Sequence, residues 1–224
     1  MASLASRLNA VVAADADEAL NVKLILTGDL FNTKSTMQPL KETLRSFLGH
    51  RSNLRALWIH DARAGWHPIA VARGWMMDGF GELEHLADCG IAKSSGLWID
   101  RWRSTAAGAD PPPPMLLCET LSKTYSQSYK PADLDAVTAA LDEASLLYLP
   151  GGNPYTLLEA LRSEVGSLVW ARAKARIDSG DLVVLTRSAG TIVAGGELGS
   201  APPPRPRNES CTPLPRLHLQ SFTG

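Results

Sequence analysis

Two stretches decide the fold of this chain: LLYLPGGNPYTLLEAL at residues 146–161 and DLVVLTRSAGTIVAGG at residues 181–196. Each is an apolar run that ends in a turn of small residues and then resumes the apolar spacing of a helix. The second turn places Ser188 where a strand is expected to give way to a helix. That position is where an α/β fold carries a nucleophile.

The rest of the chain repeats this alternation of strand and helix patterns. The expected strands are continuously apolar, so both of their faces should be covered, as in a mostly parallel sheet between helices. The sequence therefore predicts an α/β fold, a three-layer α/β/α sandwich. We expect strands at 21–29, 56–63, 96–100, 115–120, 146–149 and 181–185, and helices at 38–48, 132–144, from 154 onward and at 165–178.

Local signals mark several boundaries of these elements. Asn153 is expected to cap a helix with Pro154 in its first turn, and Gly180 to end the helix at 165–178. Pro131 stands where the helix at 132–144 should start. The proline-rich segment 103–114 should be an exposed loop. We expect a single domain over residues 1–199 and a loosely ordered, proline-rich tail over 200–224.

The composition is that of an ordinary globular protein, and its charge bears on which partners the protein can bind. The chain has 224 residues, 45% of them hydrophobic and 20% charged, with a formal net charge of −1. This balance argues against nucleic acid or a membrane as a partner, because both usually require a basic face. The short apolar patch at the N-terminus is followed at once by acidic residues, unlike a signal or transit peptide. We expect a soluble, cytoplasmic protein.

The cysteines give no sign of a metal site or a disulfide framework. Cys89, Cys118 and Cys211 are far apart in the sequence, and no CxxC pair occurs. This spacing favours a reduced compartment and predicts no bound metal. Gly28 and Asp29 end the first expected strand without a GxGxxG pattern or a P-loop lysine. We therefore expect no cofactor.

The two turns together could supply the parts that a serine nucleophile needs. A serine hydroxyl requires a base for its proton, and backbone N–H donors for the oxyanion that develops. Ala189 follows Ser188 directly, and Gly151 and Gly152 end the neighbouring expected strand without bulky side chains. The N–H groups of Ala189 and Gly152 are the candidate donors. Both would lie at the carboxyl ends of adjacent strands, where open α/β sheets bind ligands.

These motifs resemble those of a known family. PGGNPYTLLEAL is similar to the GGGNT-x-x-LL segment of the peptidase E and cyanophycinase family of serine peptidases, and TRSAGTIVAG to that family's S-A-G elbow. The resemblance implies an α/β/α fold related to class I glutamine amidotransferases (flavodoxin-like), and cleavage of peptide bonds next to aspartate by a Ser-His-Glu triad. It also implies Ser188 as the nucleophile, and Gly152 and Ala189 as the oxyanion hole.

The sequence departs from the family pattern at several positions. Pro150 replaces the first glycine of GGGN, and Thr186 replaces the glycine two residues before the serine. The only histidine after Ser188 is His218, the candidate base. The only acids after Ser188 are Glu197 and Glu209, and the acid of the triad stays unassigned. The alternative hypothesis is a non-catalytic or truncated relative. A cysteine-dependent amidotransferase and an α/β-hydrolase esterase fit less well.

The remaining candidates concern the substrate and the assembly. The substrate is expected to be a peptide or an aspartyl peptide, and Arg187 could bind its carboxylate. Gly151 and Asn153 complete the expected binding turn. His60 and Asp61 form a neighbouring pair that we interpret as polar residues at the rim of the sheet. A homodimer is left open.

Overall fold

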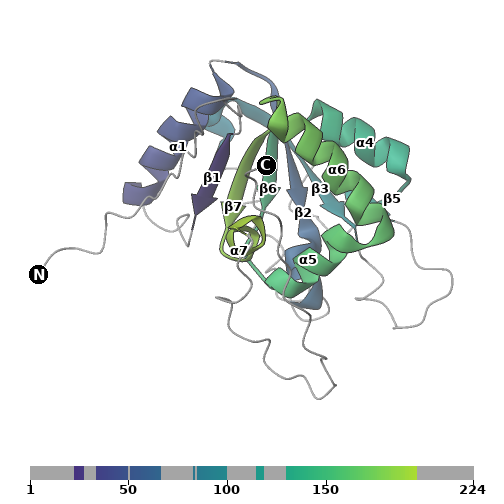
Figure 1. The fold of residues 1–224 in the computed structure, drawn as a ribbon. Coiled ribbons are helices and arrows are strands. Elements are labelled where there is room, and N and C mark those ends of the chain that lie inside the picture. The colour runs from purple at the N-terminus through teal and green to yellow at the C-terminus, as the bar shows by residue number, and fades with distance from the viewer. Residues whose placement is uncertain are drawn as a thin grey trace, which may run out of the picture.

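The computed structural model describes residues 23–27, 34–49, 51–66, 83, 85–99, 115–118 and 130–195. Within these residues, one seven-stranded sheet forms the centre of the molecule (Figure 1). Its strands are β1 (Leu24–Thr27), β2 (Leu54–Ile59), β3 (Ile91–Trp98), β4 (Met115–Cys118), β5 (Lys130–Ala132), β6 (Leu146–Leu149) and β7 (Val183–Arg187).

The sheet is mostly parallel, as the continuously apolar strands predicted. Its order is β1-β7-β6-β2-β3-β4-β5. The pairs β1–β7, β7–β6, β6–β2 and β2–β3 are parallel, whereas β3–β4 and β4–β5 are antiparallel. The carboxyl ends of β1, β7, β6 and β2 therefore meet at the same edge, and β6 lies between β7 and β2. This edge carries both small-residue turns.

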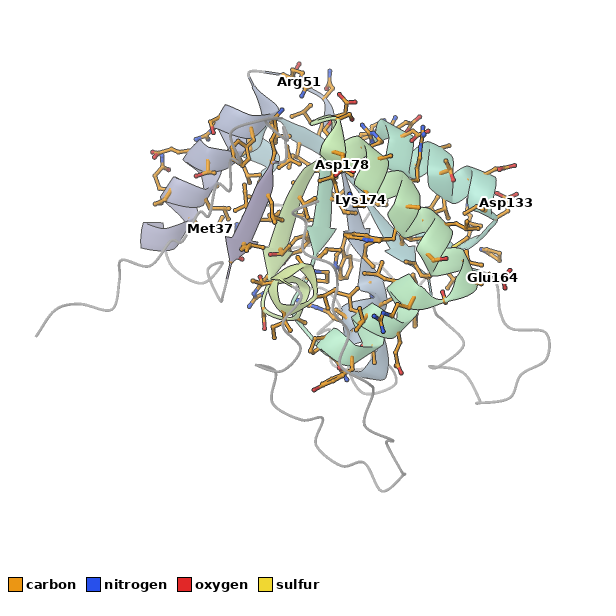
Figure 2. The ribbon with its side chains drawn as sticks, in the orientation of Figure 1. Met37, Arg51, Asp133, Glu164, Lys174 and Asp178 are labelled. Atoms are coloured by element: carbon orange, nitrogen blue, oxygen red, sulfur yellow. The ribbon has the colours of Figure 1, made fainter. Side chains whose placement is uncertain are left out.

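Helices cover both faces of the sheet. Leu40, Leu44 and Leu48 of α1 pack on one face, and the other face is covered by α4, α5, α6 and α7 (Figure 1). Figure 2 shows Met37 on α1, and Lys174 on α6. The helices are α1 (Lys34–Leu48), α4 (Leu134–Glu143), α5 (Pro154–Arg162), α6 (Glu164–Asp178) and α7 (Ala189–Gly195), with the 3₁₀ helices η1 (His60–Trp66) and η2 (Ala87–Cys89).

Alternate side chains of the central strands belong to two separate hydrophobic cores. In β6, Leu146 and Tyr148 join the core under α1, whereas Leu147 and Leu149 join the core under α4 to α7. All four side chains are buried. A strand that is buried on both faces reads as an uninterrupted apolar run, because neither set of side chains meets water. The predicted α/β sandwich is confirmed.

The expected helix signals are confirmed at two of three positions. Asn153 caps α5, because its Oδ1 accepts hydrogen bonds from Tyr155 N at 2.9 Å and Thr156 N at 3.4 Å. Gly180 follows α6 with a φ of +77, a left-handed conformation that suits glycine. Pro131 was wrongly placed at a helix start. It lies in β5, and Asp133 caps α4 by accepting from Ala136 N at 2.8 Å.

Several strands differ in their bounds from the predictions, and β7, for example, spans Val183–Arg187 instead of 181–185. The strand expected at 56–63 spans Leu54–Ile59, and the chain continues from His60 as η1. The physical reason is the buried carboxylate of Asp61, whose Oδ2 accepts from Ile99 N at 2.9 Å and holds the turn. The strand expected at 96–100 begins earlier, at Ile91, because Leu54 of β2 pairs with that residue.

Some expectations concern parts of the chain outside the described residues. These are the proline-rich loop at 103–114, the tail at 200–224, and His218. None of the helices in the described part of the chain combines the length and apolarity needed to cross a bilayer.

Candidate active site

Ser188 lies in a sharp turn from strand to helix. It stands between Arg187, the last residue of β7, and Ala189, the first residue of α7. Its φ is +44, in the left-handed region, and its side chain is exposed. This conformation costs a non-glycine residue about 1–2 kcal/mol. A strained, exposed serine at such a turn is the geometry of a nucleophile elbow.

Backbone hydrogen bonds to two neighbouring strands hold this turn. Ser188 N donates to Thr27 O of β1 at 3.0 Å, and Gly190 N donates to Pro150 O, directly after β6, at 3.1 Å. Ser188 O accepts from Ile192 N at 3.0 Å, which closes the first turn of α7. The conformation of Ser188 is thus fixed from both sides, and this is the condition under which a strained backbone persists.

Glycines bring the two predicted motifs into contact. A Cβ on Gly190 would lie 2.2 Å from Leu149 O, so only glycine lets α7 approach the end of β6 this closely. A Cβ on Gly151 would lie 3.5 Å from the Cβ of Ser188. The Gly151–Gly152 turn is therefore a direct neighbour of the serine, as the expected strand adjacency required.

Gly152 and Asn153 are fixed against η1. Gly152 has a φ of +146, and a Cβ there would lie 2.2 Å from Ala62 O. Asn153 N donates to the same carbonyl at 2.6 Å. The side chain of Asn153, expected in the binding turn, uses its oxygen to cap α5. Its described role is therefore to position the start of this helix.

Three threonines form a hydrogen-bonded cluster beside the elbow. Thr27 Oγ1 donates to Thr186 O at 2.6 Å, and Thr186 Oγ1 donates to Ile25 O at 3.3 Å. Thr191 Oγ1 lies 2.8 Å from Thr186 Oγ1 and donates to Thr27 O at 2.6 Å. The side chain of Thr186, which stands where the resembled family has glycine, is fully buried and satisfied by these contacts. The cluster joins β1, β7 and α7.

Replacing Thr191 by valine is expected to lower the free energy of unfolding by about 1 kcal/mol, the usual net value of an intramolecular hydrogen bond. Valine keeps the shape of the side chain but removes its bond to Thr27 O. Equilibrium urea unfolding followed by circular dichroism measures the change. Thr43→Val is the matched control, since Thr43 bonds Pro39 O on the exposed side of α1. Equal effects at both sites would contradict a structural role for the cluster.

Two arginines lie close to Gly151. The half-buried Arg187 has its Cγ and Cδ 3.9 Å from the position of a Cβ on Gly151. Arg63 of η1 donates from Nε to Gly151 O at 3.1 Å. Arg187 was a sequence candidate because it precedes the serine. Arg63 was missed, since no motif surrounds it, and only the packing of η1 against the turn reveals it.

His60 and Asp61 lie at the carboxyl end of β2, as expected, and both side chains are buried. Their exposed fractions are 0% and 1%. The His60 ring packs against Trp58 and Trp98, with centroid distances of 5.2 Å and 4.6 Å. The Asp61 side chain binds Ile99 N, and the backbone oxygen of Asp61 accepts a hydrogen bond from the Thr156 hydroxyl at 3.0 Å. The pair therefore lies at the rim of the sheet, as the sequence predicted, and braces η1 from inside the fold.

The cysteines described by the structure are not suited to act as nucleophiles. Cys89 and Cys118 are both buried. Burial raises the pKa of the Cys89 thiol, and the nearby carboxylate of Asp88 raises it further. Since the thiolate is the reactive form, this environment makes Cys89 inert. Among the described residues, no group of His, Cys, Asp and Glu side chains could hold a metal ion.

The chain has a structural likeness to a known protein. No protein-family model matches the sequence. No curated protein matches it. Among solved structures, the chain is similar to the crystal structure of a peptidase from an acI-B1 Actinobacterium, with 15% sequence identity and a TM-score of 0.46. The match covers 78% of this chain and 57% of that peptidase chain, little more than half of its length.

Proposed function

We propose that this chain is a serine-type peptidase with Ser188 as its nucleophile, of the kind implied by the resemblance to peptidase E and cyanophycinase. The observation that carries the proposal is the left-handed backbone of Ser188, φ +44, between β7 and α7. Strained residues that their surroundings hold in place are concentrated at active sites. The contact between Gly151 and this serine adds a second part of the same site.

The proposed reaction follows from these positions. Ser188 Oγ attacks the carbonyl carbon of the substrate while a base, proposed to be His218, accepts the hydroxyl proton. The N–H groups of Ala189 and Gly152 donate to the oxyanion. The base then gives the proton to the leaving amine, and water hydrolyses the acyl-enzyme by the reverse sequence. The acid that would orient the base is not assigned.

The proposed substrate is a peptide with an acidic residue at the cleaved bond. Arg187 supports this proposal because it directly precedes the serine and is half-buried beside Gly151. A guanidinium binds a carboxylate with two parallel hydrogen bonds, which fix both the charge and the orientation of the ligand.

A serine-directed phosphonate probe tests the proposal. We expect the folded protein to be labelled, with the modified peptide containing Ser188. We also expect His218→Ala to slow labelling by about 10²- to 10⁴-fold, the contribution of a general base. Undiminished labelling of His218→Ala would assign the base to another residue. If the folded wild-type protein is not labelled, the non-catalytic alternative replaces the proposal.

A further inference from the structure

Arg63 reaches the Gly151–Gly152 turn from a different strand than the serine does. It belongs to η1, which follows β2, whereas Ser188 follows β7, and β6 runs between these two strands (Figure 1). Arg63 Nε donates to Gly151 O at 3.1 Å. The guanidinium carbon also lies 6.0 Å from the centre of the Trp58 ring, which is fully buried. Two different contacts thus hold the arginine in place.

The contacts of the turn define which way each peptide group points. Pro150 O bonds Gly190 N on the β7 side, whereas Gly151 O bonds Arg63 on the β2 side. Asn153 N bonds Ala62 O, again on the β2 side. Because the C=O and N–H of a trans peptide point in opposite directions, the Gly152 N–H points away from the Arg63 guanidinium that binds Gly151 O.

We infer that Arg63 is a positioning residue that locks the Gly151–Gly152 peptide with its N–H toward Ser188. This inference rests on the proposed function, since the N–H serves as an oxyanion donor only if Ser188 is a nucleophile. A lock is needed because two consecutive glycines lack the steric limits that restrict other residues. Rotation of this peptide group would turn its carbonyl oxygen toward the serine and remove the donor.

Three variants separate the hydrogen bond from the bulk of the side chain. Arg63→Met keeps an unbranched apolar stem but has no donor. Arg63→Lys keeps both a stem and a donor. Arg55→Met is the matched control. Arg55 lies near the amino end of β2, whereas Arg63 follows the carboxyl end of this strand in η1, and Arg55 forms an exposed ion pair with Glu143. Exposed ion pairs contribute little to stability.

The first measurement is the rate of phosphonate labelling at saturating probe. We expect Arg63→Met to slow labelling by about 100-fold, as for loss of one oxyanion donor. Probe affinity should change little, because the lock acts on the transition state. Arg63→Lys should recover most of the rate, and Arg55→Met should match the wild-type protein. Labelling of Arg63→Met at the wild-type rate would overturn the inference, as would a Lys variant as slow as the Met variant.

The second measurement does not depend on activity. Nuclear magnetic resonance of the ¹⁵N-labelled protein reports the Gly152 amide shift and the exchange protection of the Arg63 Nε–H. We expect a protected Nε–H in the wild-type protein, and a shifted or exchange-broadened Gly152 amide in Arg63→Met alone. An unprotected Nε–H in the wild-type protein would overturn the inference even if Arg63→Met failed to fold.

The two measurements distinguish the two possible failures. If the wild-type protein is not labelled, the proposed peptidase activity fails. The Gly152 resonance then still decides whether Arg63 fixes the peptide. Suppose instead that the wild-type protein is labelled and that Arg63→Met changes neither the labelling rate nor the Gly152 amide resonance. Ser188 is then still supported as the nucleophile, and the positioning role of Arg63 is rejected.

Discussion

Replacing Ser188 by alanine is expected to reduce hydrolysis of aspartyl dipeptides and β-aspartyl polymers by about 10³-fold or more, as for loss of the nucleophile in serine proteases. The reason is chemical: alanine has no oxygen to attack the carbonyl carbon. The side chain of Ser188 is exposed, so its removal leaves no cavity. Steady-state assays with both substrate classes, on protein whose fold is verified by circular dichroism, measure the effect. Equal rates for the variant and the wild-type protein would exclude Ser188 as the nucleophile.

Ser188→Gly is the control that tests the elbow itself. Both variants lack the hydroxyl, so both should be inactive. They differ in backbone preference, because glycine adopts a φ of +44 without the steric cost that alanine meets. We expect the glycine variant to be more stable than the alanine variant by about 1 kcal/mol. If the alanine variant is as stable in urea unfolding as the glycine variant, the left-handed backbone at position 188 carries no measurable strain.

Replacing Gly190 by alanine is expected to have the largest effect on stability. The added Cβ would lie 2.2 Å from Leu149 O and 2.7 Å from Leu149 C, both backbone atoms of β6. Neither can move without shifting the central strand, so α7 must move away. We expect a loss of about 3 kcal/mol, at the upper end of the usual cost of overpacking. The free energy of urea unfolding measures it, and phosphonate labelling should fall as the elbow is displaced.

Gly195→Ala is the matched control in the same helix. Nothing lies within 4 Å of a Cβ at position 195, and the residue ends α7 on its exposed side. Alanine is the better helix former by about 1 kcal/mol, so stability should be unchanged or slightly higher. A similar loss at both positions would show that α7 tolerates no added methyl group anywhere. The specific contact with Leu149 would then not be the cause.

The local features of the site could be predicted from the sequence. The apolar runs at 146–149 and 181–185 predicted the two central strands, and Asn153 predicted the start of the helix between them. Ser188 was placed correctly at the change from strand to helix. These features depend on side-chain periodicity and helix capping, which involve residues only a few positions apart. Such local interactions can therefore be predicted from the sequence.

The same local rules failed where a distant contact decided the outcome. Pro131 looked like a helix start, but its segment pairs with β4 and became β5. The strand expected to continue through Arg63 ends at Ile59, because the Asp61 carboxylate binds the backbone of Ile99. In both cases the deciding partner lies outside the stretch that produced the signal.

By itself, then, the sequence determined an α/β chain with a serine at a strand-to-helix turn beside a glycine turn. Only the tertiary structure decided what surrounds that serine. Strand order places β6 between β7 and β2 and so brings Arg63 to the carbonyl of Gly151. It also joins Thr27 and Thr191 across β1 and α7. Such contacts link residues far apart in the chain, and no local periodicity records them, because they form only once the sheet has assembled.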